Sequence, residues 1–176
     1  MDNSKIWLIA DTHFCHNNII KYCNRPFTSA DEMDKKMITN WNSAVKNKDR
    51  IFMLGDFCLA GRDRIVEVGN KLNGRKTLIM GNHDSASLKT YYEAGFEIVS
   101  RHPIIIEDFI ILSHEPMFTP RKYPYFNIYG HVHNDERFKD YTSTSFCVSA
   151  ERLDYTPIRL DTIKDVVERY LHENMS

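Results

Sequence analysis

Short apolar runs that end in polar residues constrain this chain more than any other feature of its sequence. Such runs, bounded by turn-forming residues, are typical of buried strands. Segments with helical spacing separate the early runs, whereas the later runs follow one another. This order indicates an α/β fold with a largely buried, mixed sheet. The runs are IWLIAD (6–11), RIFMLGD (50–56), KTLIMGNHD (76–84), FIILSHE (109–115), FNIYGHVH (126–133), SFCVSA (145–150) and TPIRL (156–160).

Helical segments are indicated by apolar residues that recur every three or four positions. Ser29 and Glu32 have the spacing of a capping box, which precedes an apolar pattern over 33–45. Further helices are expected over 65–72, over 87–95 and, with Asp161 as a possible cap, over 163–171.

The polar residues that end the runs are Asp, Asn and His. Because a ligand site in an open α/β sheet lies at the carboxyl ends of the strands, we expect these residues to gather. Oxygen and nitrogen donors without thiolate suit Mn²⁺, Fe, Zn²⁺, Co²⁺ or Ni²⁺, and the set is too rich in histidine for a dedicated Mg²⁺ or Ca²⁺ site. The donors are also too many for one tetrahedral ion, so two ions sharing a carboxylate are expected. The set comprises Asp11, His13, Asp56, Asn82, His83, His114, His131 and His133.

Each motif has a plainer interpretation when it stands alone, since GD and GNHD are common in turns and His114 could be a hydrogen-bonded core residue. The HVH motif is more specific. Residues two apart on a strand face the same side, so His131 and His133 would lie together beside Gly130. The motifs taken together favour a metal site over a coincidence of turns.

Length and composition narrow the class of protein. The chain has 176 residues, which predicts a single domain over 1–176, and its 42% of hydrophobic residues allows a sizeable core. A formal net charge of −1 argues against an extended nucleic-acid interface. No apolar run is long enough to span a bilayer, and the start lacks the pattern of a signal peptide. The four cysteines show no CxxC spacing, so free thiols and a cytoplasmic location are expected.

On these residues the chain resembles the calcineurin-like metallophosphoesterase family, whose pattern DxH, GD, GNH(D/E), H and GHxH is complete from Asp11 to His133. The resemblance implies a four-layer α/β/β/α sandwich of mixed sheets with a dinuclear metal centre at its edge. Mn²⁺ is the first choice of metal, with Fe, Zn²⁺, Co²⁺ and Ni²⁺ as alternatives. The resemblance assigns Asp11, His13 and His133 to one ion, Asn82, His114 and His131 to the other, and Asp56 to both.

The resemblance also implies that His83 is not a ligand but faces the scissile phosphate as the acid for the leaving group, with Asp84 orienting it. Two ions about 3.5–4 Å apart can clamp a phosphate and supply a metal-bound hydroxide for in-line attack. The expected activity is therefore that of a dinuclear-metal-dependent phosphoesterase. Its substrate would be a small phosphorylated or nucleotide-like molecule, either a monoester or a diester.

Two further stretches suggest substrate contacts. In DTHFCHNNIIKYCNRPF, which is similar to small members of the family, His16 and Arg25 are expected near the site, with Arg25 pairing a substrate phosphate. The alternative is that Arg25 caps a helix or pairs with an acid. TPRKYPYFNIY (119–129) combines positive charge with Tyr123 and Tyr125, which hints at base stacking, although a packed loop is the plainer interpretation.

A different class of function is an interaction scaffold of the same fold with structural or vestigial metals. A scaffold has no chemical need for His83, and its ligand positions would be free to change. The presence of His83 with every ligand position favours the enzyme. A purely structural zinc site does not match the chemistry, because such sites are usually closed and rich in cysteine. The substrate and the oligomeric state stay open.

Overall fold

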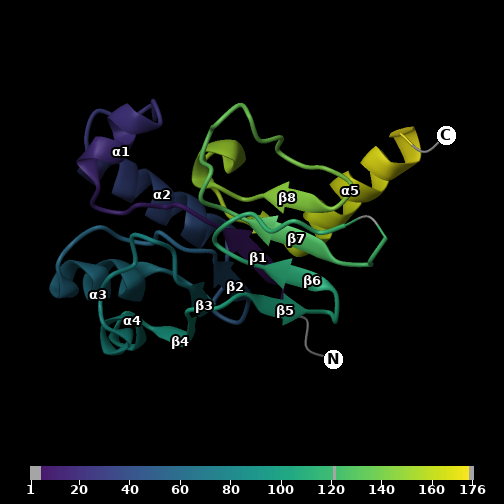
Figure 1. The fold of residues 1–176 in the computed structure, drawn as a ribbon. Coiled ribbons are helices and arrows are strands. Elements are labelled where there is room, and N and C mark those ends of the chain that lie inside the picture. The colour runs from purple at the N-terminus through teal and green to yellow at the C-terminus, as the bar shows by residue number, and fades with distance from the viewer. Residues whose placement is uncertain (1–4, 121, 175–176) are drawn as a thin grey trace.

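The computed structural model describes residues 5–120 and 122–174, and it contains two β-sheets with helices around them (Figure 1). The first sheet has five strands in the order β4-β3-β2-β1-β9. Strands β1 to β4 are parallel, and β9 is antiparallel to β1. These strands are β1 (Ile6–Ile9), β2 (Arg50–Met53), β3 (Arg75–Ile79), β4 (Phe96–Ser100) and β9 (Ile158–Arg159).

The second sheet has four strands in the order β5-β6-β7-β8. Strands β6, β7 and β8 are parallel, and β5 is antiparallel to β6. Both sheets are mixed, so the predicted α/β fold with mixed sheets is confirmed. On the face of this sheet that points away from the first sheet, the loop residue Phe138 packs against Tyr129 and Cys147. The strands are β5 (Ile104–Ile106), β6 (Ile110–Leu112), β7 (Phe126–Tyr129) and β8 (Ser145–Cys147).

The four predicted helices, α2, α3, α4 and α5, begin and end close to the expected positions, and two short helices, α1 and η1, were not predicted. At the start of α2, the hydroxyl of Ser29 accepts the N–H of Glu32 at 3.2 Å, so the predicted cap forms. The Glu32 carboxylate, however, accepts from the N–H of Thr28 at 2.8 Å and does not bond back to Ser29. The helices are α1 (Asn17–Tyr22), α2 (Ala30–Ala44), α3 (Arg62–Lys71), α4 (Leu88–Glu93), α5 (Leu160–Asn174) and the 3₁₀ helix η1 (Ala150–Leu153).

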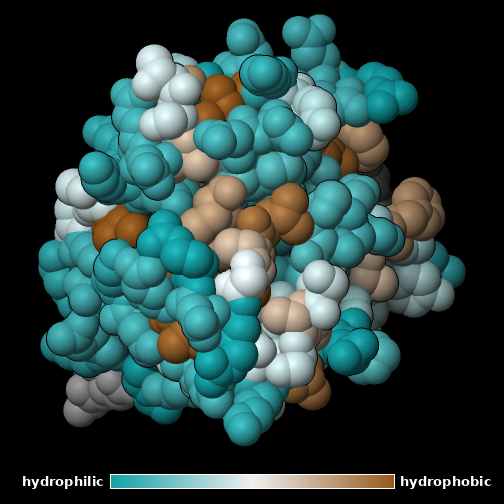
Figure 2. Space-filling view, turned by 90° about the vertical axis from the view of Figure 1, so that its left-hand side faces the viewer, coloured by the Kyte–Doolittle hydropathy of each residue, from teal (hydrophilic) through white to brown (hydrophobic). Residues whose placement is uncertain are grey.

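The five-stranded sheet is buried on both faces because its apolar residues alternate between two clusters. Ile9 and Met53 pack with Trp41 of α2 on the helical side. Leu8 and Phe52 pack between the two sheets. Figure 1 places α3 and α4 on the side away from β6 and β7. From that side the surface is mostly hydrophilic, with a few apolar side chains near its centre (Figure 2).

Helix α5 follows β9 directly and packs into the cluster between the sheets through Leu160, Ile163 and Val167. Because the helix begins at Leu160, Asp161 lies in its first turn and not at the predicted cap position. The negative side chain is still favourable there, since the first turn carries the positive end of the helix dipole. Within the described ranges, no helix combines the length and apolarity needed to cross a membrane.

The carboxyl ends of the parallel strands of both sheets meet at one edge. Ala10, just after β1, pairs with Ser149 beyond β8 in a parallel bridge that joins the two sheets. Gly130, just after β7, lies so close to the first sheet that an added Cβ would overlap that of Ala10 and lie 2.7 Å from Oδ2 of Asp11. The sequence therefore needs glycine at this position to bring the two sets of strand ends together.

We expect the Gly130→Ala substitution to destabilise the protein by about 1–3 kcal/mol, because an overpacked site must move backbone to relieve the overlap. Urea denaturation would measure the free energy of unfolding. The matched control is Gly61→Ala, since an added Cβ there has no neighbour within 4 Å. Equal stability of the two variants would contradict the close approach of the sheets.

Candidate metal centre

Many of the candidate ligands have a left-handed backbone conformation. A residue other than glycine is strained there by roughly 1–3 kcal/mol, and such residues cluster at functional sites. The conformation turns the chain sharply after each strand and directs the donor side chains to the shared edge. The residues and their φ angles are Asp11 (56°), His13 (48°), Asp56 (56°), His131 (70°) and His133 (48°).

The HVH motif lies beyond its strand and not within it. Strand β7 ends at Tyr129, so strand alternation, as expected from the sequence, does not orient His131 and His133. Instead, both histidines have left-handed backbone while Val132 between them is buried against Tyr129. The strand explanation was therefore wrong: consecutive turns, with Val132 as the anchor, direct the two rings to two different groups of donors.

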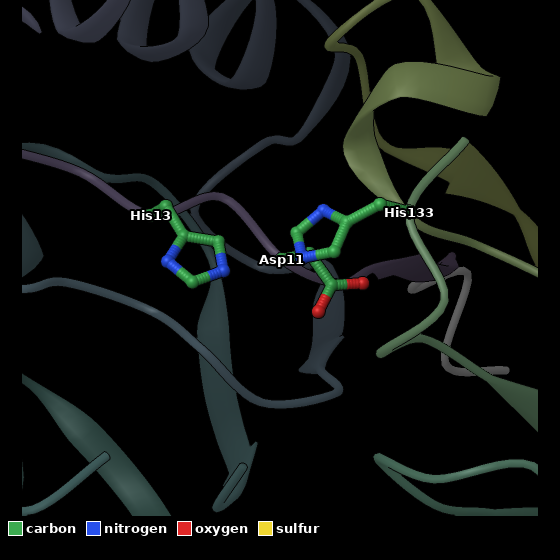
Figure 3. A group of neighbouring side chains, drawn as sticks. All are labelled: Asp11, His13 and His133. Carbon is green, nitrogen blue, oxygen red and sulfur yellow. The ribbon is translucent and has the colours of Figure 1, made fainter. Parts of the chain in front are cut away.

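One group consists of Asp11, His13 and His133, whose donor atoms all lie within 4.8 Å of one another. Figure 3 shows Asp11 and His13, on the segment after β1, near His133, which comes from the segment after β7. The rings of His13 and His133 are stacked with centroids 5.2 Å apart. Nε2 of His13 is buried without a hydrogen-bond partner and lies 3.4 Å from Oδ2 of Asp56. A buried nitrogen without a partner is costly, and a cation between these donors would satisfy it.

A second group consists of Asn82, His114 and His131. Nε2 of His114 lies 2.9 Å from Oδ1 of Asn82 and 3.1 Å from Nδ1 of His131. Nδ1 of His114 lies 2.9 Å from the carbonyl oxygen of Leu54, which assigns the ring proton to Nδ1. Nε2 then presents a lone pair to the amide oxygen of Asn82. Two acceptors facing each other fit a cation between them.

Asp56 lies between the two groups, because its Oδ2 is 3.4 Å from Nε2 of His13 and 3.6 Å from Nε2 of His114. All seven candidate ligands are thus brought together, in two groups that meet at Asp56.

Burial and charge in the site keep His13 and Asp56 in the protonation states that bind a metal ion. Burial lowers the pKa of His13 to about 4, so its ring is neutral at pH 7. Burial acts to raise the pKa of Asp56, but the neighbouring His13 and His114 rings and the backbone N–H of His83 outweigh it and hold that pKa at about 2. Burial raises the pKa of Asp11 to about 6. A neutral imidazole and an ionised carboxylate are the forms that bind a metal ion.

Asp84 has a different role from the predicted one. Its buried carboxylate does not contact the His83 ring but accepts N–H bonds from Asp56 at 2.7 Å, Phe57 at 3.1 Å and Gly81 at 2.9 Å. These bonds join the turn after β2 to the turn after β3. Asp84 therefore holds Asp56 in place, and the expectation that it orients His83 is corrected.

Arg25 pairs with an acid, which was the alternative interpretation. Its guanidinium is fully buried and donates to Oε1 of Glu151 at 2.6 and 2.9 Å. It also donates to the carbonyl oxygens of Asp11 at 2.7 Å and Thr12 at 2.9 Å. Because its donors are used inside the protein, Arg25 does not reach a substrate phosphate. It supports the loop that carries Asp11 and His13.

Glu151 is the functional residue that the sequence reasoning missed. Its Oε1 lies 3.0 Å from Nδ1 of His133, so it fixes the ring that completes the first group. The bond from His133 and the charge of Arg25 outweigh burial and hold the pKa of Glu151 at about 2. Cys23 also lies near this pair, but the Arg25 guanidinium would repel a cation there. The sequence did carry a signal for this residue. Like the candidate ligands, Glu151 directly follows an apolar run, SFCVSA.

We expect Glu151→Gln to weaken Mn²⁺ affinity by about 10–100-fold, the usual cost of losing an outer partner of a metal-ligating histidine. The variant should also be less stable by about 3–5 kcal/mol, because it leaves the buried Arg25 without a counter-charge. Calorimetric Mn²⁺ titration and urea denaturation measure the two effects. Glu97→Gln is the control, because Glu97 pairs with Arg75 at the surface, where ion pairs contribute little.

His83 and His16 border the first group from the solvent side. The His83 ring is exposed, with its centroid 5.4 Å from that of His13, and the backbone N–H of His83 donates to Oδ1 of Asp56 at 2.9 Å. Nδ1 of His16 lies 3.3 Å from Nδ1 of His13. Both imidazoles are thus adjacent to the candidate ligands and accessible to a substrate.

The aromatic residues Tyr123 and Tyr125 lie elsewhere. They line a cavity of about 670 Å³ between α5 and the amino-terminal ends of β6 and β7. None of the candidate metal ligands lines this cavity. Tyr123 and Tyr125 therefore offer no stacking surface at the metal centre.

Two mixed sheets that carry paired Asp and His donor groups at one edge define an α/β protein with a candidate metal centre. The chain belongs to the calcineurin-like phosphoesterase family, whose model matches residues 4–170. The family generally acts as metal-dependent phosphoesterases and typically binds divalent metals.

Two relatives span almost the whole chain, and a third spans less than half of it. The uncharacterized protein MJ1445 of Methanocaldococcus jannaschii is 35% identical over 175 residues, covering 96% of this chain and 94% of that protein. The crystal structure of the protein of unknown function AQ665 from Aquifex aeolicus matches with a TM-score of 0.73 and 29% identity, covering 93% of this chain and 100% of that one. The gene 66 protein of Mycobacterium phage D29 is 33% identical over 84 residues, which is 46% of this chain and 41% of that protein.

Proposed function

We propose that this protein hydrolyses a phosphate ester with two divalent transition-metal ions, with Mn²⁺ as the first candidate. The observation that carries the proposal is the pair of donor groups that meet at Asp56. In one group Nε2 of His13 is buried without a partner, and in the other the acceptors of Asn82 and His114 face each other at 2.9 Å. Both arrangements are unfavourable for the side chains alone and fit bound cations.

Bound there, two divalent ions would bind phosphate oxygens and activate water for attack on phosphorus. Asp11, His13 and His133 would hold one ion, and Asn82, His114 and His131 the other, with Asp56 shared. His83 supplies the acid: water forms a bond to phosphorus on the side opposite the leaving oxygen and loses a proton to solvent, the bond from phosphorus to the leaving oxygen breaks, and His83 donates a proton to that oxygen. His16 stands on the same open side and would contact the substrate.

The substrate we propose is a small phosphorylated or nucleotide-like molecule, as a monoester or a diester. The formal net charge of −1 supports a small substrate, because an extended nucleic acid is usually bound by a basic surface.

The test is hydrolysis of 4-nitrophenyl phosphate and bis(4-nitrophenyl) phosphate by protein treated with a chelator and then supplied with Mn²⁺, Zn²⁺, Co²⁺ or Ni²⁺. We expect activity to depend on added metal, and the preferred ester would identify the substrate class. Binding of metal without hydrolysis of either ester or of alkyl phosphates would favour the scaffold function. Calorimetric metal titration separates that outcome from a failure to bind metal.

A further inference from the structure

A small cavity of about 310 Å³ lies beside His83, between the loops that follow β2 and β3 and the starts of α3 and α4. Apolar and polar side chains both line it, and the polar ones include Arg62, Ser87 and Thr90. The residues that matter for its chemistry are Leu59, Ala60, Ile65, His83, Ser85 and Ala86.

His83 belongs to both the cavity and the metal centre. Its ring lies next to the first donor group, with its centroid 5.4 Å from that of His13. Its backbone N–H donates to Asp56, which fixes the position of the residue relative to both donor groups. A phosphate on the metal centre would therefore have His83 at its side, with the cavity directly beyond.

The position of the cavity gives it a role if the proposed function holds. His83 protonates the leaving oxygen, so the carbon skeleton attached to that oxygen must lie next to His83. The space available there is this cavity. Its volume lies at the small end of the roughly 300–1,000 Å³ range of ligand pockets, which suits one ring and not a polymer.

We propose that this cavity binds the leaving group of the substrate, and that the leaving group is a single-ring alcohol, either aromatic or of sugar size. Leu59, Ala60, Ile65 and Ala86 provide apolar contact for the ring. The hydroxyl of Ser85 can bond to a polar substituent. This proposal rests on the proposed function, because only that function places the leaving group next to His83.

The test compares the binding of two phosphonates to the Mn²⁺-loaded protein by calorimetry. Phenylphosphonate carries one ring and methylphosphonate carries none, and the P–C bond of each resists hydrolysis. We expect the wild type to bind phenylphosphonate about tenfold more tightly, as burial of a ring should provide. Ala60→Leu and Ala86→Leu, which fill the cavity from its two loops, should abolish this preference and leave methylphosphonate affinity unchanged. Ala44→Leu at the end of α2 is the matched control and should retain the preference.

Two results would overturn the inference: equal affinity of the wild type for the two phosphonates, or a preference retained by both filled variants. Thermal unfolding checks that each variant folds, and the two loops are tested independently. The readout does not require turnover. A ring preference without hydrolysis of any ester would count against the proposed function alone, whereas no binding of either phosphonate would overturn both.

Discussion

The Asp56→Asn variant should lose metal-dependent hydrolysis by about 10³-fold or more. Asp56 is the carboxylate shared by the two donor groups, 3.4 Å from Nε2 of His13 and 3.6 Å from Nε2 of His114. Asparagine keeps the shape but removes the negative charge that both ions would need. A bound metal supplies several kcal/mol of transition-state stabilisation, which corresponds to a loss of this order.

The measurement is kcat for the preferred nitrophenyl ester, together with the rise in Tm on addition of Mn²⁺. Both should fall in the variant, since a ligand that binds only the folded state raises Tm. Asp161→Asn is the control, because this carboxylate is exposed on α5, away from the site. Full activity of Asp56→Asn would exclude a centre with a shared carboxylate.

The second large effect is expected for His83→Ala. General acid catalysis by a positioned side chain contributes about 10²–10⁴-fold, so hydrolysis of an alkyl phosphate should fall by that factor. Nitrophenolate leaves readily without a proton, so hydrolysis of the nitrophenyl ester should fall much less. Affinity for Mn²⁺ should not change, because His83 is not a proposed ligand.

The comparison of the two esters distinguishes an acid from a merely structural residue. A structural defect would reduce hydrolysis of both esters equally. His102→Ala is the control, because His102 is exposed beyond β4 and its backbone makes its described hydrogen bonds. Equal losses for the alkyl and nitrophenyl esters would contradict the role of His83 as acid.

The sequence predicts the central parts of the fold because their residues have strong periodicity. Met33, Met37 and Trp41 recur at helical spacing and are buried in α2. The strands that the sequence did not predict, β4 and β5, each form one edge of their sheet. Most residues of β4 are exposed or half-buried, and β5 has only three residues, so neither gives a strong apolar pattern. Helix α1 has six residues, too few to show a helical period.

The candidate ligands could be predicted from the sequence because each is a polar residue close after a buried apolar run. The residues that hold these ligands in place could not be predicted, because their contacts depend on which distant segments the fold brings together. Arg25 and Glu151 are 126 positions apart and meet only in the folded chain. Asp84 sits beside His83 in sequence, yet its partners belong to the neighbouring strand end. Sequence proximity suggested the wrong partner in that case.

The candidate ligands come from both sheets, and this has a consequence for how the protein unfolds. Asp11, Asp56 and Asn82 follow strands of the first sheet, whereas His114, His131 and His133 follow strands of the second. Ions bound among them would cross-link the two sheets without any covalent bond. Each sheet could then separate from the other only by releasing metal. Amide hydrogens of both sheets should therefore exchange with solvent together, and the metal concentration should set the rate of that shared opening.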